Sequence, residues 1–179
     1  GLYIGLDYAG GPRTEIGAPL ESLDDMMPPL ADIPEEGETS GLPAVEVDMQ
    51  RAEEVLKLVN DERAKKGLQP LVLDETLCVG ATIRAKEQKT LFSHTRPDGT
   101  SAFTVFDEIK ATAPWKGENL LKGSRKLDAA KVVGAWMNSQ GHKDNILHEQ
   151  FTKIGVGYYQ TDPNVERDPY GYWVQLFSN

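Results

Sequence analysis

Two stretches near the end of the chain, Ile154-Gly155-Val156-Gly157-Tyr158 and Tyr172-Trp173-Val174-Gln175-Leu176-Phe177, determine the fold class. In both stretches bulky apolar residues recur at every second position, which is typical of a strand with one buried face. We therefore expect the chain to close with two antiparallel strands.

The residues upstream of these strands carry helical rather than strand patterns. Apolar residues recur at helical spacing in three long segments, which begin after the N-cap candidates Asp48, Asp74 and Asp128. The predicted helices end before Gly67, near Thr90 and near Asn138, and a short helix is expected over residues 101–109. Helices that precede clustered strands predict an α+β sandwich.

The chain has a single cysteine, Cys78, so an intrachain disulfide and a cysteine-rich zinc site are both excluded. Leu77, Cys78, Ala81 and Ala85 share the apolar side of the second predicted helix. Cys78 is therefore expected to be a small buried residue rather than a nucleophile.

The overall composition is that of an ordinary soluble protein of 179 residues with a net charge of -9. A nucleic-acid binder needs a basic surface, which this composition does not supply. No apolar run reaches the roughly 20 residues that span a bilayer, so no transmembrane segment is expected. The chain begins at Gly1 rather than Met, so we expect an N-terminal portion to have been removed, which is compatible with a lost signal peptide or anchor.

The charge divides the chain into two parts. Residues 1–50 hold 11 acidic side chains and one basic side chain, whereas residues 51–179 hold 17 acidic and 18 basic side chains. The first part is also rich in proline and glycine, and such a composition does not bury enough apolar area to form a core. Residues 1–47 are predicted to be a tail or linker, except that residues 2–8 have a strand-like pattern, and residues 48–179 are predicted to be the folded domain.

Three polar residues in irregular stretches are the candidates for chemistry: His94, Glu118 and His142. Two imidazoles and a carboxylate are suitable ligands for zinc or copper, and the same groups are suitable for general acid–base catalysis. Their spacing alone also fits residues that only brace loops or helix ends. These alternatives stay open at the level of the residues.

Serine and the third histidine give weaker signals. Ser93, Ser101 and Ser139 lie near the histidines, but no GxSxG nucleophile elbow is present. Ser139 stands three residues before His142, a spacing that permits contact. His148 is expected on an exposed turn, and we assign it no function.

Four ordered motifs carry a family resemblance: HTRPDG (residues 94–99), GENL (117–120), GHKDNIL (141–147) and IGVG (154–157). Together with residues 58–63 and 172–177, they closely resemble the CAP superfamily, the SCP-like domains shared by cysteine-rich secretory proteins, venom antigens and plant pathogenesis-related proteins. The nearest match is the short, cysteine-poor bacterial branch. The resemblance covers roughly residues 47–179.

The resemblance implies a three-layer α-β-α sandwich with a small antiparallel sheet and a cleft around two histidines and two glutamates. His94, Glu118 and His142 match three of these four positions, but Ser139 stands where the larger family has the second glutamate. The resemblance associates the histidines with divalent metal, so His94 and His142 are expected to hold zinc or another divalent ion, with water and Glu118 completing the shell.

The expected ligand site also includes Ser139, together with Asn119 and Asn145, which are expected to brace the motif backbones. Its ligand is left open: a metal, a small molecule, a lipid, a glycan or a protein partner. The resemblance implies a secreted or envelope-associated protein.

Three functions remain open. The favoured hypothesis is binding in the cleft without catalysis, because no complete acid–base set and no nucleophile are apparent. The second is a metal-dependent, peptidase-like hydrolase in which His94, Glu118 and His142 activate water. In the third, the motif residues only stabilise loops, and function lies elsewhere on the surface or in the acidic tail.

Overall fold

The computed structural model describes residues 3–5, 41–162, 164 and 168–179. In these residues the helices are α1 (Met49–Ala64), α2 (Glu75–Thr90), α3 (Thr104–Glu108), α4 (Ala129–Met137) and α5 (Gln140–Ile146). The strands are β1 (Tyr3–Gly5), β2 (Val72–Leu73), β3 (Lys116–Ser124), β4 (Lys153–Gln160) and β5 (Tyr170–Ser178). No helix in these ranges is long and apolar enough to cross a bilayer.

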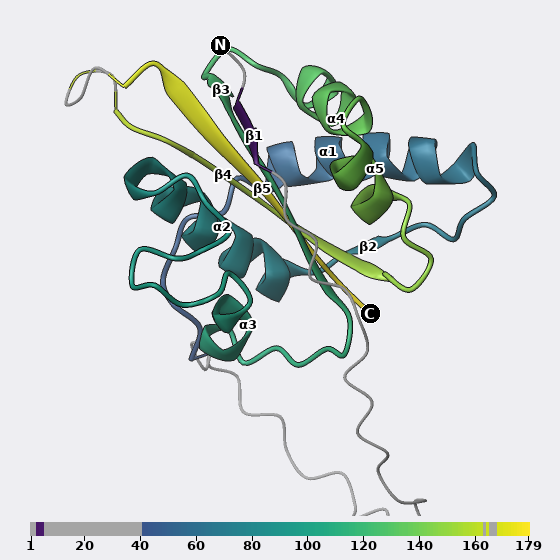
Figure 1. The fold of residues 1–179 in the computed structure, drawn as a ribbon, viewed down its shortest axis with the longest axis horizontal. Coiled ribbons are helices and arrows are strands. Elements are labelled where there is room, and N and C mark those ends of the chain that lie inside the picture. The colour runs from purple at the N-terminus through teal and green to yellow at the C-terminus, as the bar shows by residue number, and fades with distance from the viewer. Residues whose placement is uncertain (1–2, 6–40, 163, 165–167) are drawn as a thin grey trace, which may run out of the picture.

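The strands form one sheet in the order β1-β3-β5-β4-β2 (Figure 1). The pairs β1–β3, β3–β5 and β4–β5 are antiparallel, and the short pair β2–β4 is parallel. The predicted closing strands are confirmed as β4 and β5, which lie side by side at the centre of the sheet. The long partner β3, which the sequence did not predict, pairs with β5 over nine residues, from Lys116 opposite Ser178 to Ser124 opposite Tyr170.

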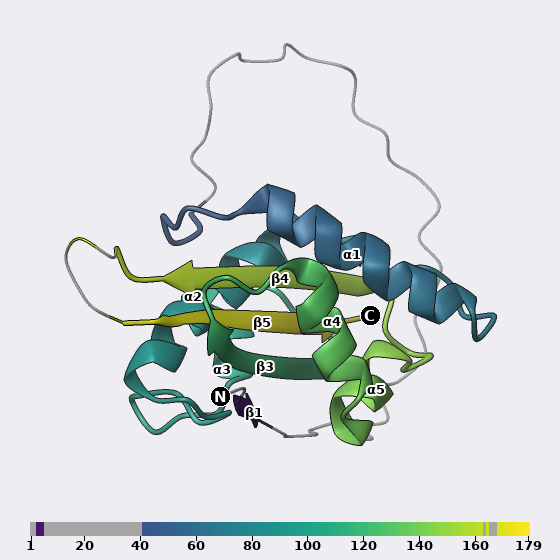
Figure 2. The same ribbon diagram turned by 90° about the horizontal axis from the view of Figure 1, so that it is seen from above.

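Helices cover both faces of this sheet and give three layers. Figure 2 places α1, α4 and α5 in front of the sheet and α2 and α3 behind it. Alternate side chains of β5 enter the two cores: Trp173 and Phe177 pack with the first group of helices, and Val174 and Leu176 pack with the second. The predicted α-β-α sandwich is confirmed.

The three predicted N-caps are confirmed. The carboxylates of Asp48, Asp74 and Asp128 accept hydrogen bonds from the third backbone N–H of α1, α2 and α4, at distances of 2.9–3.0 Å. Each such cap contributes about 1 kcal/mol because it satisfies a backbone donor that the helix leaves unpaired.

Helix α2 lies directly on the backbone of β4 because two residues of the IGVG motif have no side chain. A Cβ atom at Gly155 would lie 2.2 Å from the Leu77 carbonyl carbon, and one at Gly157 would lie 2.1 Å from the Ala81 carbonyl carbon. No side chain fits in this space, so the motif sets the distance between helix and sheet.

Cys78 lies at this contact and is fully buried, as predicted. Its sulfur accepts a hydrogen bond from the Val156 N–H at 3.4 Å. Burial raises the pKa of the thiol to about 11, so the thiolate that a nucleophile requires is scarce at neutral pH.

Two of the predicted local structures are wrong. Glu118 was expected at an irregular position but lies within β3, and His142 was expected in a loop but lies within α5. Glycine, glutamate and asparagine have low strand propensity, and β3 forms there because β5 offers it a complete row of partners.

The N-terminal predictions are only partly covered by the described residues. The predicted strand in residues 2–8 is confirmed at Tyr3–Gly5, which forms β1. The rest of the predicted tail up to residue 40 lies outside the described residues, so the division at residue 48 stays a prediction.

Candidate functional site

The candidate site is built around Glu118 and Asn119, two successive residues of β3. Successive side chains of a strand point to opposite faces of the sheet. Glu118 accordingly contacts Arg84 of α2, and Asn119 contacts the backbone of α5 at His142. One strand therefore positions two separate groups of polar side chains, one on each face.

On the α2 face, Glu118 forms a buried ion pair with Arg84. The guanidinium donates to the two carboxylate oxygens over 2.7 and 3.1 Å, and the exposed fractions are 0% for Arg84 and 1% for Glu118. Burial alone lowers the pKa of Arg84, but hydrogen bonds and charge interactions with Glu118 and Glu87 more than offset this effect and raise it. Arg84 therefore keeps its positive charge although it is fully buried.

His94 joins this pair through its ring. Its Nδ1 lies 2.8 Å from Glu118 Oε1, and because an ionised carboxylate only accepts hydrogen bonds, Nδ1 carries the proton. In the neutral ring, the lone pair is then on Nε2, which is buried and has no hydrogen-bond partner among the described residues. Buried polar atoms are nearly always paired, so His94 Nε2 is the ring atom available for contact with a ligand.

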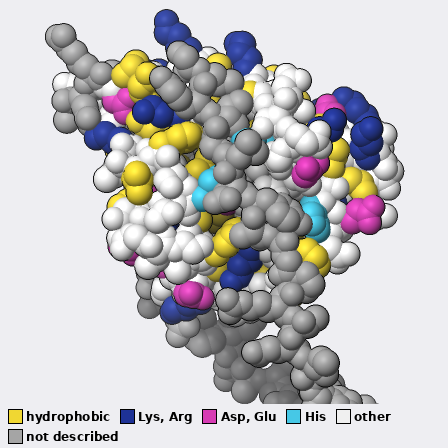
Figure 3. Space-filling view, viewed as in Figure 1, with side chains coloured by type: hydrophobic (Ala, Val, Ile, Leu, Met, Phe, Trp, Pro, Cys, Tyr) yellow, Lys and Arg dark blue, Asp and Glu magenta, His cyan; other side chains and the backbone are white. Residues whose placement is uncertain are grey.

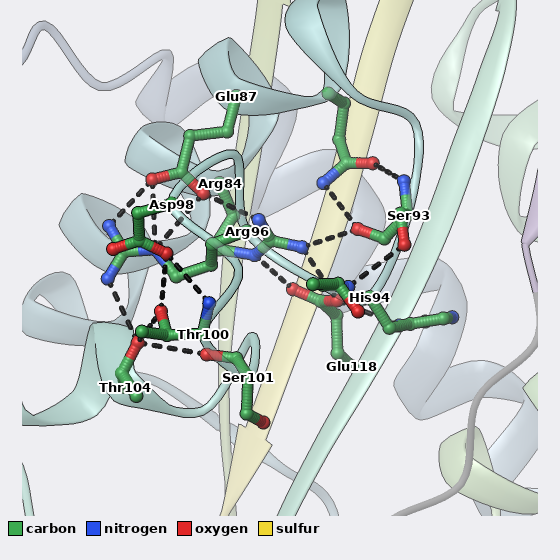
Figure 4. A network of polar contacts seen from close by, with 12 residues as sticks. Arg84, Glu87, Ser93, His94, Arg96, Asp98, Thr100, Ser101, Thr104 and Glu118 are labelled. Atoms are coloured by element: carbon green, nitrogen blue, oxygen red, sulfur yellow. Dashed lines mark hydrogen bonds and ion pairs between the residues drawn. The ribbon is translucent and has the colours of Figure 1, made fainter.

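The backbone before His94 is held equally firmly. The Ser93 carbonyl accepts from Arg84 at 2.8 Å and from Gln88 at 3.1 Å, and the Ser93 N–H donates to Gln88 at 2.9 Å. Arg84 thus fixes both the carboxylate that orients the imidazole and the peptide that carries it (Figure 4).

A second arginine extends this network along the HTRPDG loop. Arg96 donates to Glu87 at 2.6 Å, and Glu87 also accepts from Arg84 (Figure 4). Arg96 donates to Glu108 of α3 as well, at 2.8 Å. The hydrogen bonds and charges of Glu87 and Glu108 offset the effect of burial and raise the pKa of Arg96. Alternating charges therefore connect α2, the loop and α3.

On the α5 face, the polar contacts of Asn119 and Asn145, among the described residues, are with neutral groups. Asn119 donates to the His142 carbonyl at 3.1 Å and to Gln175 at 3.0 Å, and Asn145 donates to Asn119 at 2.9 Å and to the Glu118 carbonyl at 3.3 Å. Both asparagines thus brace backbone carbonyls, as predicted from the sequence. The Nε2 atom of Gln175 is buried there with no partner among the described residues.

The ring of His142 contacts Ser139, the N-cap of α5. Ser139 Oγ lies 2.8 Å from His142 Nδ1 and makes no capping bond to the helix backbone. The contact that the three-residue spacing permitted is therefore present. His142 is 1% exposed.

The structure brings the predicted residues together as two groups rather than as one cluster. His94 contacts Glu118, and His142 contacts Ser139 and Asn119. Within the described ranges, no three His, Cys, Asp or Glu side chains gather as a metal-ligand set. Figure 3 shows histidine side chains at separate points on one face of the molecule.

The third histidine is less exposed than predicted. The His148 ring packs between Trp115 and Phe151, at centroid distances of 5.2 and 4.8 Å. Burial and the positive charge of Arg63 lower its pKa below the ordinary 6.5. These contacts place His148 in an aromatic stack at the edge of one core.

The roles of Arg84 and Gln88 in the site were not predicted from the sequence. A signal was available, because Arg84 falls seven residues after Leu77 and three after Ala81, on the apolar side of the helix. A charged residue on a buried stripe requires a buried partner, and here that partner is Glu118.

One cavity lies away from these residues. It measures about 590 Å³ at the N-terminus of α1, and Arg51, Lys86, Tyr158 and Tyr159 are among its lining residues. None of the predicted site residues lines it.

Comparison with known proteins supports the architecture. The model of the CAP family, described as the cysteine-rich secretory protein family, matches residues 56–177. The uncharacterized protein YkwD of Bacillus subtilis (strain 168) is 41% identical over 109 residues, which are 60% of this chain and 42% of YkwD. The uncharacterized membrane protein YlbC of the same organism is 29% identical over 106 residues, 58% of this chain and 30% of YlbC. The chain thus spans less than half the length of both relatives.

Solved structures agree with this assignment. An extracellular protein with an SCP domain from Bacillus anthracis str. Ames has a TM-score of 0.63 and 26% identity, covering 73% of this chain and 41% of that one. An outer surface protein from Borrelia burgdorferi, with a TM-score of 0.60 and 24% identity over 70% of this chain and 89% of its own, shares the fold. Since the family model covers more than half of its residues, the chain belongs to the CAP family.

Proposed function

We propose that this protein binds a ligand between His94 and His142, two histidines that are held from either side of β3. We further propose that it does not catalyse a reaction there. The observation that carries this proposal is the Nε2 atom of His94, which is buried and unpaired among the described residues while Nδ1 is fixed by Glu118. An imidazole held in this way presents a lone pair to a metal ion or to a hydrogen-bond donor.

A divalent metal is the first ligand to test. The donor set fits zinc in part: His94 and His142 are the residues that would hold it, and both are supported by further contacts, as metal-binding histidines usually are. Bound zinc would supply Lewis acidity. Glu118 is a poor third ligand because its two oxygens already accept from Arg84 and His94.

The same contacts argue against the hydrolase alternative. A general base that activates water needs a carboxylate oxygen within reach of that water. Glu118 is 1% exposed and is neutralised by Arg84. We therefore expect no cleavage of casein or of a peptide library above background, with zinc present.

We further propose an extracellular or envelope-associated location. The support is the similarity to the extracellular SCP-domain protein from Bacillus anthracis, at 26% identity. Ligand classes other than metal are tested by screening lipid vesicles and glycans for binding.

The proposal is tested by calorimetric titration of zinc into metal-free protein. We expect saturable binding near one equivalent in the parent and none in the His94→Ala/His142→Ala variant. The matched control is His148→Ala, which removes the histidine that lies in the aromatic stack and should leave zinc binding unchanged. Equal binding in the parent and in the double variant would contradict the metal site.

A further inference from the structure

We infer that the cavity at the N-terminus of α1 is a second binding site, which takes a small zwitterion of the amino-acid or dipeptide class. The cavity measures about 590 Å³, within the range of about 300–1,000 Å³ that is usual for small-molecule sites. Its walls are residues 46–49 and Arg51 at the start of α1, Lys86 of α2, and residues 158–160 at the end of β4. Neither histidine proposed to bind zinc is among them, so this inference does not rest on the proposed function.

One wall of the cavity is a part of the β4 edge that no described strand covers. β2 pairs with β4 only at its first two residues, so residues 155–160 extend beyond it. On this edge the Ile154 carbonyl accepts a hydrogen bond from the β2 side, and the Val156 N–H donates to the sulfur of Cys78. Alternate residues of an antiparallel strand direct their backbone groups the same way. Tyr158 therefore directs its N–H and C=O toward the edge where the cavity lies.

The opposite wall is the segment that leads into α1. Leu42 packs with the core on the α2 face and Val47 with the core on the α1 face, so the chain crosses the edge of the sheet between them (Figure 2). Among the described residues, this crossing segment makes no backbone hydrogen bond to β4. The backbone groups at the end of β4 are therefore left to a ligand that enters between the strand and the crossing segment.

The charges of the lining decide the class of ligand. Two cations, Arg51 and Lys86, and two carboxylates, Glu46 and Asp48, line the cavity. Asp48 is already used, because it accepts from the Arg51 backbone N–H at 3.0 Å and pairs with the Arg51 guanidinium. Lys86 and Glu46 form no ion pair within the described part of the chain. A ligand with a single charge would match only one of these two groups, whereas a zwitterion matches both.

Arg51 is positioned in advance to hold a carboxylate. Its guanidinium lies over the Tyr158 ring, 4.4 Å from the centroid, and one of its nitrogens is anchored by Asp48. A guanidinium has five N–H donors, so donors remain for a ligand, and the side chain is 39% exposed. We therefore place the ligand's carboxylate at Arg51 and Lys86 and its ammonium group at Glu46.

The remaining lining favours an apolar side chain on the ligand. Val47, Met49 and Tyr159 supply apolar surface, and methionine adapts its shape to what it contacts. The open backbone groups of Tyr158 are suited to pair with a peptide group. Leucyl-leucine has free termini, apolar side chains and one peptide group, and it is the probe that we choose.

The test is calorimetric titration of the full chain with leucyl-leucine, with its N-acetyl form and with its C-terminal amide. We expect saturable binding of leucyl-leucine near one equivalent. Each blocked form should bind about tenfold more weakly or less, because it loses one charge-assisted hydrogen bond. No saturable binding at millimolar leucyl-leucine, or equal binding of all three forms, would overturn the inference.

Two variants assign the ends of the ligand. Lys86→Gln should narrow the difference in affinity between the free acid and the amide, and Glu46→Gln should narrow the difference between the free and the acetylated amine. The matched controls are Lys57→Gln and Glu53→Gln, which change the net charge equally at exposed positions of α1 outside the cavity. The controls should leave all three affinities unchanged; equal effects of variants and controls would show that only the net charge matters and would overturn the assignment.

The site is distinguished from the zinc site by location. Leucyl-leucine should shift the NMR amide signals of Tyr158 and Gln160, and the His94→Ala/His142→Ala variant should bind it with the affinity of the parent. Loss of binding in that variant would overturn a separate site. Failure of the zinc titration would leave these expected results unchanged, because neither histidine lines the cavity.

Discussion

The two histidines of this protein are supported in opposite ways. His94 is held by charge, through Glu118 and the fully buried Arg84, whereas His142 is held by neutral groups, through Ser139, Asn119 and Asn145. The two supports begin at adjacent residues of one strand. Among the described residues, strand alternation thus separates a group of charged side chains from a group of neutral ones, and the two sides should respond differently to mutation.

The largest effect is expected on the charged side. Arg84→Met should lower the free energy of unfolding by about 3–5 kcal/mol, because it leaves the Glu118 carboxylate buried with no countercharge. The measurement is urea denaturation. The double variant Arg84→Met/Glu118→Gln no longer buries an unpaired carboxylate, so it should recover part of the lost free energy of unfolding. No recovery would show that the loss comes mainly from the missing hydrogen bonds of Arg84 to Ser93 and Glu87.

On the neutral side, a smaller loss is expected. Asn145→Ala removes the donor to Asn119 and to the Glu118 carbonyl and should cost about 1–3 kcal/mol. The control is Gln140→Ala on the same helix, where an exposed bond to Asp144 is lost and the change should stay within about 0.5 kcal/mol. A loss for Asn145→Ala as large as that for Arg84→Met would remove the contrast between the two sides.

Ser139→Ala should cost no helix capping, because Ser139 makes no capping bond, but it removes a hydrogen bond to the buried ring of His142 and should cost about 1 kcal/mol. The ¹⁵N shifts of the His142 ring should also change, because Nδ1 loses its hydrogen bond to Ser139. The matched control is Asp128→Ala at the N-cap of α4, where a real capping bond is lost at a cost of about 1 kcal/mol. Asp128→Ala should leave the ¹⁵N shifts of the His142 ring unchanged, and unchanged shifts in Ser139→Ala as well would contradict the assigned role of Ser139.

His148 belongs to neither side and gives the smallest effect. Its pKa is lower in the folded state than the 6.5 of an ordinary histidine, so the unfolded state binds more protons between these values. The contribution of neutral His148 to the free energy of unfolding is therefore complete above pH 6.5. It is lost as the pH falls through the lowered pKa that His148 has in the folded state. In urea titrations, the free energy of unfolding should fall less between pH 7 and pH 5 in the His148→Gln variant than in the parent. An identical fall in both proteins would show that other titrating groups set the pH dependence in this range.

The architecture was predictable because its signals are local. Period-two alternation identified β4 and β5, and aspartates before apolar periods identified the starts of α1, α2 and α4. These patterns depend on neighbouring residues alone.

The placement of Glu118 and His142 was not predictable from local signals. Glu118 lies in a strand of low intrinsic propensity that forms because β5 supplies its partners, and His142 lies in a helix of only seven residues. At Glu118, pairing with β5 overrides the low strand propensity of the local sequence. At His142, the helix is too short for a helical pattern to be recognised in the sequence.

The contact between α2 and β4 has a thermodynamic consequence for binding. Since Gly155 and Gly157 bring the helix backbone against the strand, α2 has no compressible layer of side chains on which to shift. Arg84 and Gln88, and through them His94, are therefore in place before any ligand arrives. A ligand that reaches His94 gives up little conformational entropy of the protein, so more of its contact energy appears as affinity.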